Sequence, residues 1–188
     1  MSETDAGDVA LALAERFERA NIPYAIGGAL AYGMYSVPRA TLDVDMNVFV
    51  EPDDLAGVLA VVREMGVAVD DVAARRDAEK EGLFVVWAGI VRIDFFTPSI
   101  PFSWEALKTR CRLTFRGRDA WFLSAEALAV FKLLFFRGKD VSDLERLVGT
   151  AGRTLDHAYV RRSVVDMLGP DDARVHTWDE LVKQHLPS

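Results

Sequence analysis

Two short stretches decide the fold. Residues 26–31 read Ile-Gly-Gly-Ala-Leu-Ala, and residues 39–45 read Arg-Ala-Thr-Leu-Asp-Val-Asp. The apolar run at 24–26 stops at the glycine pair, and a helical pattern follows it up to Pro38, which predicts a strand, a tight turn and a helix in succession. Residues 44–50 are rich in valine and other apolar side chains, so they predict a second strand.

The second of these strands carries a pair of carboxylates. Asp43 and Asp45 are two positions apart, so on a strand they point to the same face with Cβ atoms roughly 7 Å apart. Their apolar neighbours indicate a largely buried strand, where two like charges are costly unless a cation neutralises them. Mg²⁺ prefers oxygen ligands and keeps positions open for phosphate oxygens. The pair is therefore a candidate metal site.

A third carboxylate, Asp94, lies in the apolar run 90–96. We expect this run to pair antiparallel with 43–50, which would bring Asp94 beside Asp43 and Asp45 and suit a two-metal site for phosphoryl or nucleotidyl transfer. Simpler readings stay open. Asp-x-Asp is frequent by chance, Asp94 could pair with Arg92 or Arg39, and the glycine pair would serve equally as a plain strand-to-helix turn.

Elsewhere the pattern predicts helices and short strands up to residue 123 and helices only after it. Expected helices cover 8–20 and 53–65, with a helix or mobile loop at 70–81. A hairpin is expected across Ala88-Gly89 and another at 110–123 around Gly117, while Pro98 and Pro101 break the chain between them. The last third predicts helices at 124–137, 140–149, 156–168 and 171–185. We therefore expect an α/β (α+β) core at 1–123, with a small mixed sheet flanked by helices, and a C-terminal helical bundle at 124–188.

Composition narrows the classes of protein. No stretch of 18 residues is apolar and uncharged, and the N-terminus is acidic where a signal peptide is basic, so we expect a cytoplasmic protein with no membrane span. One cysteine excludes an internal disulfide and a cysteine-based zinc cage. The P-loop, the dinucleotide glycine motif and Gly-x-Ser-x-Gly are absent. The three histidines lack metal-pair spacing, so helix-surface or cap positions are expected for them.

The charge is uneven along the chain. The formal net charge is −7, and the first hundred residues carry 8 basic and 17 acidic side chains. Five basic residues fall at even positions in 108–118, and on an extended strand they would share one face. That face is either a solvated strand surface or a phosphate-binding one; its members are Lys108, Arg110, Arg112, Arg116 and Arg118.

Taken together, these motifs resemble the DNA polymerase β-like nucleotidyltransferase superfamily. The glycine pair and the run from Arg39 through Thr41 to Asp45 look like the AbiEii-type toxin nucleotidyltransferases. The likeness continues into 123–132 and 137–144, where a helix lysine precedes a Lys-Asp-x-x-Asp-Leu run. It spans about residues 22–147. One departure is Gly28, which stands where many relatives have a serine.

The resemblance implies an enzyme that moves an NMP from an NTP to an acceptor hydroxyl with Mg²⁺ or Mn²⁺. It assigns catalysis and metal binding to Asp43, Asp45 and Asp94, with Asp94 as a base or only a metal ligand. It assigns the nucleotide to Gly27, Gly28, Arg39, Thr41, Lys132, Lys139 and Asp143.

Several of these residues have plainer alternatives. Lys132 could instead pair with Asp143 or extend to solvent, and Asp140 reads as a helix N-cap. Arg39 could be an ion-pair partner of a carboxylate.

The expected acceptor is tRNA, as in toxin–antitoxin systems, with Arg110, Arg112, Arg116 and Arg118 as its contacts and a cognate antitoxin as a partner. A small molecule such as an aminoglycoside, a protein hydroxyl, or a catalytically inert nucleotide-binding domain are the alternatives. The sequence leaves the acceptor, the preferred NTP and the oligomeric state open.

Overall fold

The computed structural model describes residues 5–186. By compactness the chain divides into two units. Unit 1 joins the segment that ends at Ala31 to Arg39–Leu123, and unit 2 joins Tyr32–Pro38 to the segment that begins at Ser124. The residues at 32–38 thus pack with the C-terminal helices, although they precede most of unit 1 in the chain. The assignment of domains to 1–123 and 124–188 stays a prediction.

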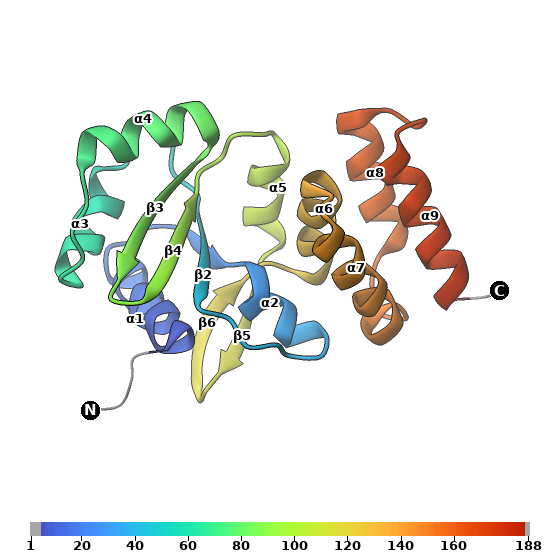
Figure 1. Ribbon diagram of the computed structural model, residues 1–188, viewed down its shortest axis with the longest axis horizontal. Coiled ribbons are helices and arrows are strands. Elements are labelled where there is room, and N and C mark those ends of the chain that lie inside the picture. The colour runs from blue at the N-terminus through green and yellow to red at the C-terminus, as the bar shows by residue number, and fades with distance from the viewer. Residues whose placement is uncertain (1–4, 187–188) are drawn as a thin grey trace. The chain divides into compact units, whose positions relative to one another are not determined.

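Unit 1 is built on a mixed sheet (Figure 1). Within the described residues it has six strands in the order β3-β4-β2-β1-β6-β5. The pairs β2/β4 and β1/β6 are parallel and the other neighbours are antiparallel. The strands are β1 (Tyr24–Ile26), β2 (Asp43–Val48), β3 (Leu83–Ala88), β4 (Val91–Phe96), β5 (Cys111–Phe115) and β6 (Arg118–Phe122).

The antiparallel pairing expected between 90–96 and 43–50 is wrong, because β4 runs parallel to β2. The reason is that β3 takes the edge of the sheet and β4 lies next to β2. Since β3 runs opposite to β2, the hairpin from β3 to β4 returns the chain to the direction of β2. That hairpin turns at Gly89 and Ile90, one residue later than expected, and Gly89 has a positive φ of 62° that suits such a turn.

The buried face of the sheet packs against α1 (Ala6–Arg19). Apolar residues recur at helical spacing along α1, and Phe17 at its end contacts Tyr24 and, edge-on, Phe95 of β4. Asp5 caps the helix by accepting the N–H of Asp8 at 3.0 Å. Phe95 in turn stacks on Phe84 of β3, with ring centroids 4.9 Å apart. This core holds every second residue of β2, β3 and β4 on one side of the sheet.

Three further helices belong to unit 1: α3 (Ala56–Glu64), α4 (Asp71–Glu81) and α5 (Phe102–Thr109). The segment 70–81 is a helix, since Asp70 caps it and Gly82 ends it with a positive φ of 66°. The sequence did not predict α5. Pro101 stands just before its first turn, where a missing N–H costs nothing, so the proline precedes the helix without breaking it.

Unit 2 is helical, as the sequence predicts for the C-terminal part. It holds the later residues of α2 (Gly28–Tyr35), which begins in unit 1, together with α6 (Ala125–Phe135), α7 (Gly138–Ala151), α8 (His157–Leu168) and α9 (Ala173–His185). Ser124, Asp156 and Asp172 cap three of these helices with their side chains. No helix within residues 5–186 is long and apolar enough to cross a membrane.

Candidate functional site

The carboxylates lie on the face of the sheet opposite the α1 core. Asp45 of β2 is directly beside Asp94 of β4, and Asp43 is beside Arg92. The parallel register therefore brings all three carboxylates to one face. The sequence analysis expected this convergence, but from antiparallel pairing of the two strands. The expectation of a buried pair is wrong as well, because Asp43 is exposed and Asp45 is half-buried. The strand itself is largely buried, as expected, since the alternate residues Val44, Met46 and Val48 are in the core.

Arg92 is a cation built into this cluster. Its Nε donates to Oδ1 of Asp94 at 2.6 Å, so the structure shows Arg92 as an ion-pair partner of Asp94. The hydrogen bond and charge of Asp94 raise the pKa of the Arg92 guanidinium, and the charges of Asp43 and Asp45 raise it further. Three carboxylates thus act on one guanidinium, and the four side chains together carry a formal charge of −2.

The glycine pair packs directly against β2. The N–H of Gly27 donates to the backbone oxygen of Asp45 at 2.8 Å. Gly28 has a φ of 54°, and a Cβ there would lie 1.7 Å from Oδ2 of Asp45. At Gly27, a Cβ would lie 2.7 Å from Nδ2 of Asn47. Glycine is needed here because the start of α2 approaches the Asp45 carboxylate too closely for any side chain. This close approach explains why glycine stands where many relatives have a serine.

The segment before β2 contributes two of the predicted nucleotide ligands. Oγ1 of Thr41 accepts the N–H of Asp43 at 3.0 Å, so it shapes the entry into β2. Arg39 is exposed on the same segment of unit 1. The structure thus brings Gly27, Gly28, Thr41 and the carboxylates into one neighbourhood, and their binding roles stay predictions.

The remaining predicted nucleotide ligands lie in unit 2. Nζ of Lys132 is 2.6 Å from Oδ2 of Asp143 and 3.6 Å from Oδ1 of Asp140, and it lies 5.5 Å from the ring centroid of Tyr32. All of these side chains are buried. Of the alternatives for Lys132, the structure shows the ion pair with Asp143. Lys139 is exposed.

Asp140 is not the N-cap that the sequence suggests. The N-cap of α7 is Arg137, and Asp140 is the third residue of the helix. Its Oδ2 accepts the backbone N–H of Arg137 at 3.2 Å and the side-chain Nε at 2.6 Å. Burial raises the pKa of the Asp140 carboxyl, but the Arg137 hydrogen bond and the charges of Lys132 and Arg137 outweigh it, so the pKa is lowered overall.

The basic residues at 108–118 do not share one strand face. Lys108 lies on α5 and pairs with Glu105, and Arg116 lies in the β5–β6 turn with a φ of 52°. The prediction failed because α5 extends to residue 109 and the hairpin strands are only five residues long. Arg118 begins β6 on the far side of the turn.

Three of these arginines have partners within unit 1. Arg110 donates to the backbone oxygen of Tyr24 at 2.8 Å and lies over Trp121. Arg112 pairs with Glu18 at 3.2 Å. Arg116 pairs with two carboxylates of α1 and its cap, Asp8 and Asp5. Their role in acceptor binding stays a prediction.

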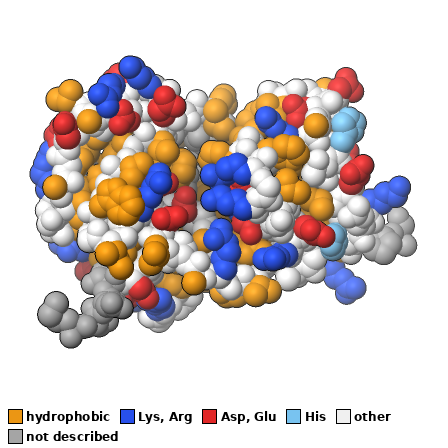
Figure 2. Space-filling model, in the orientation of Figure 1, with side chains coloured by type: hydrophobic (Ala, Val, Ile, Leu, Met, Phe, Trp, Pro, Cys, Tyr) orange, Lys and Arg blue, Asp and Glu red, His pale blue; other side chains and the backbone are white. Residues whose placement is uncertain are grey.

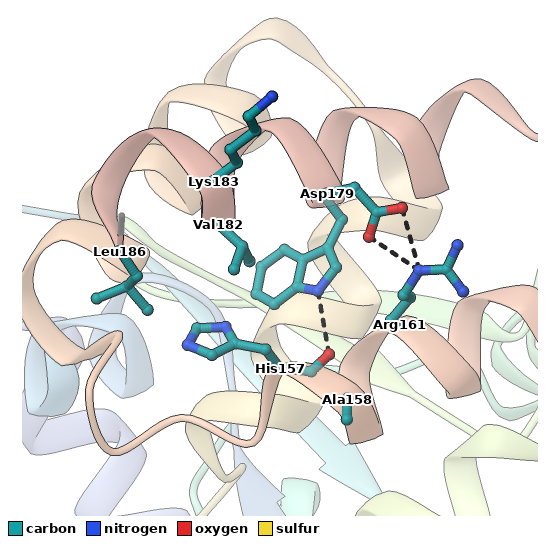
Figure 3. A pocket seen from close by; sticks show the side chains of 8 residues that line it. His157, Ala158, Arg161, Asp179, Val182, Lys183 and Leu186 are labelled. Carbon is teal, nitrogen blue, oxygen red and sulfur yellow. Dashed lines mark hydrogen bonds and ion pairs between the residues drawn. The ribbon is translucent and has the colours of Figure 1, made fainter. Parts of the chain in front are cut away.

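His157 of unit 2 has helix-packing contacts. His157, the first residue of α8, donates from Nε2 to the backbone oxygen of Gly152 at 2.5 Å, and its own backbone oxygen accepts Nε1–H of Trp178 (Figure 3). A shallow hollow of about 360 Å³ lies beside these rings, between α8 and α9. Arg161 and Asp179 form an ion pair at its wall. These contacts stabilise the helix pair.

Sequence reasoning missed two side chains on the carboxylate face. Trp87 of β3 is paired with Arg92, and Val85 is paired with Asp94. Residues 83–88 are all apolar, so their sequence shows no alternation. In the structure Phe84 and Val86 are buried, and the residues between them point the other way. Placing the turn one residue early would have made Ile90 the partner of Trp87.

The mixed sheet, with its glycine turn closed against an Asp-x-Asp strand and its helical C-terminal part, is a nucleotidyltransferase-like α/β fold. No protein-family model matches the chain, and no curated protein matches its sequence. Solved structures of similar fold include two of one enzyme. The solution structure of the antibiotic-resistance factor ANT(2'')-Ia has a TM-score of 0.64 and 15% identity, covering 93% of this chain and 97% of that one. The crystal structure of ANT(2'')-Ia in complex with adenylyl-2''-tobramycin has a TM-score of 0.61 and 14% identity, covering 85% and 95%. At these identities the likeness concerns the fold.

The donor set suits a hard divalent cation. Within residues 5–186 no group of three or more histidine, cysteine or acidic side chains is arranged to hold a metal ion by itself. Mg²⁺, however, is commonly bound by one or two carboxylates and completed by substrate phosphates. Asp43 and Asp45 therefore fit an ion that binds together with a nucleotide, and a bound ion there would offset phosphate charge.

Arg92 should weaken the binding of a divalent cation without nucleotide. Replacing Arg92 with Gln removes one positive charge from the carboxylate cluster, and we expect affinity for Mn²⁺ alone to rise about five- to tenfold, roughly the 1 kcal/mol of a half-exposed charge pair. Calorimetric titration with MnCl₂ measures the change. Arg92→Lys keeps the charge and should bind Mn²⁺ like the wild type. Equal Mn²⁺ affinity in the wild type and both variants would show that Arg92 does not affect binding of the cation.

Proposed function

We propose that the protein is a nucleotidyltransferase that moves an NMP from an NTP to a hydroxyl of a cationic small molecule, with Mg²⁺ or Mn²⁺. The observation that carries the proposal is the convergence of Asp43, Asp45 and Asp94 on one sheet face, against the Gly27-Gly28 turn. In the reaction the acceptor oxygen attacks the α-phosphorus, the bond to the β-phosphate oxygen breaks, and pyrophosphate leaves.

The residues of unit 1 supply distinct parts of this chemistry. Asp43 and Asp45 hold the cation that accompanies the triphosphate. The Gly28 backbone lets the start of α2 approach the same region, where unpaired helix N–H groups favour phosphate. Asp94, oriented by Arg92 through Oδ1, accepts the proton of the acceptor hydroxyl.

The cationic acceptor is favoured over tRNA by charge. The carboxylate face has a formal charge of −2, and the first hundred residues carry 17 acidic against 8 basic side chains. Three of the four arginines expected to bind RNA phosphates are engaged with acidic groups or backbone of unit 1: Arg110, Arg112 and Arg116. The ANT(2'')-Ia structure with adenylyl-2''-tobramycin supports an aminoglycoside as the first acceptor to test. A tRNA acceptor, with an antitoxin partner, is the alternative.

The test is a transfer assay with the purified protein. Each of the four NTPs, labelled at the α-phosphate, is incubated with Mg²⁺ and either tobramycin or total tRNA. We expect labelled tobramycin and released pyrophosphate, and background label with Asp45→Asn. Label found only in tRNA would replace the acceptor class. No label on any acceptor, with any NTP, would overturn the proposed function.

A further inference from the structure

The carboxylate face continues onto the edge strand of the sheet. Strand pairing places Trp87 beside Arg92 and Arg92 beside Asp43, in one row across β3, β4 and β2. A second row runs from Val85 through Asp94 to Asp45. Figure 2 shows hydrophobic, basic and acidic side chains next to one another over this part of unit 1. An apolar surface therefore borders the carboxylates directly.

Both apolar side chains of this surface are exposed. Trp87 is 58% exposed and Val85 is 39% exposed, whereas Phe84 and Val86, which alternate with them, are buried in the core. Tryptophan is highly buried on average, so an indole that is more than half exposed on an edge strand is unusual. Exposed aromatic surface bordered by charge is typical of a binding site.

The spacing suits a ring-shaped acceptor. Neighbouring strands lie about 4.8 Å apart, so the backbone of Trp87 is roughly 10 Å from that of Asp43, two strands away. An acceptor whose hydroxyl lies at the carboxylates can therefore place an adjoining ring over Trp87. Because Arg92 lies between Trp87 and Asp43, its guanidinium is a hydrogen-bond donor next to that ring.

The chemistry of the surface selects the kind of acceptor. The indole face packs against the apolar face of a sugar and attracts an ammonium group. The three carboxylates, only partly offset by Arg92, attract further ammonium groups and repel phosphates. A cationic amino sugar satisfies both demands, whereas a phosphate group that arrives without a divalent cation does not.

We propose that Trp87 and Val85 form an acceptor platform that binds one ring of a cationic amino sugar, while the nucleotide is held beside it through the cation at Asp43 and Asp45. This inference rests on the proposed function and deepens it, since it names the residues that recognise the acceptor. Trp87 acts in binding and takes no part in the chemical step.

The test is calorimetric titration with tobramycin, and separately with ATP and Mg²⁺. For Trp87→Ala we expect tobramycin affinity to fall about five- to thirtyfold, the range of a lost ring and ammonium contact, with ATP affinity and melting temperature unchanged. Trp87→Phe should retain most of the affinity. Ile90→Ala, which truncates a still more exposed apolar residue in the adjacent turn, should bind like the wild type.

The outcomes separate this inference from the proposed function. Wild-type binding of tobramycin that Trp87→Ala leaves intact overturns the platform, while labelled tobramycin in the transfer assay would still uphold the function. Trp87-dependent binding without transfer to any acceptor upholds the platform and overturns the function. A wild-type protein that does not bind tobramycin overturns the platform.

Discussion

Replacing Lys132 with Met is expected to lower the free energy of unfolding by about 3–5 kcal/mol, the cost of breaking a buried ion pair from one side. Methionine fits the apolar surroundings of α6, so packing is not the cause. The cause is Asp143, whose carboxylate is buried and would lose the ammonium group that lies 2.6 Å away. Urea denaturation followed by circular dichroism measures the change.

Two variants test this explanation. Lys132→Met combined with Asp143→Leu removes both charges, and we expect it to recover most of the lost stability, because apolar replacement of a buried pair is often neutral. Lys139→Met removes an exposed charge of the same unit and should change stability by less than about 0.5 kcal/mol. A Lys132→Met protein that unfolds like the wild type but binds ATP more weakly would instead assign the ammonium group to the nucleotide.

The second large effect is expected at Gly28. Gly28→Ala should lower the free energy of unfolding by about 2–3 kcal/mol, because alanine resists a φ of 54° and its Cβ displaces the Asp45 carboxylate. Asp45 must move by more than 1 Å, since the Cβ would otherwise lie 1.7 Å from its Oδ2. We therefore expect the rate of nucleotidyl transfer to fall about a hundredfold, the usual effect of such a misplacement.

Gly66→Ala is the matched control for Gly28→Ala. Gly66 has a φ of 73°, and a Cβ there meets nothing within 4 Å, so this variant carries the backbone cost alone. It should lose about 1–2 kcal/mol of stability and keep the wild-type transfer rate. If Gly28→Ala and Gly66→Ala have the same stability and the same transfer rate, the close approach of α2 to Asp45 does not affect function.

The sequence predicted the order of elements well because its local signals were strong. The glycine pair, the valine-rich strand at 44–50 and the helical pattern from Ser124 onward each specify structure within a few positions. The convergence of Asp94 with Asp45 was also expected, although through antiparallel pairing. Strand direction depends on which of β3 and β4 lies next to β2, and nothing local in either strand decides that.

The site was harder to predict where it depends on partners distant in sequence. Lys132 reads equally well as a phosphate ligand and as an ion-pair partner, and only the packing of α7 against α6 brings Asp143 to it. Arg116 belongs to a period-two pattern in the sequence, but the turn at Gly117 removes it from the strand. Nothing in the sequence distinguishes Trp87 from its neighbours, because its strand is apolar throughout.

The position of the three-residue strand β1 delays completion of the sheet until late in synthesis. It lies between β2 and β6 in the sheet. Its pairing with β6 forms only after Phe122, the partner of Ile26, has been synthesised. At the usual rate of translation, about 5–20 s separate the emergence of these two residues. During that interval the backbone of β1 has one open edge, which is the kind of surface that chaperones cover and that nascent chains use to aggregate.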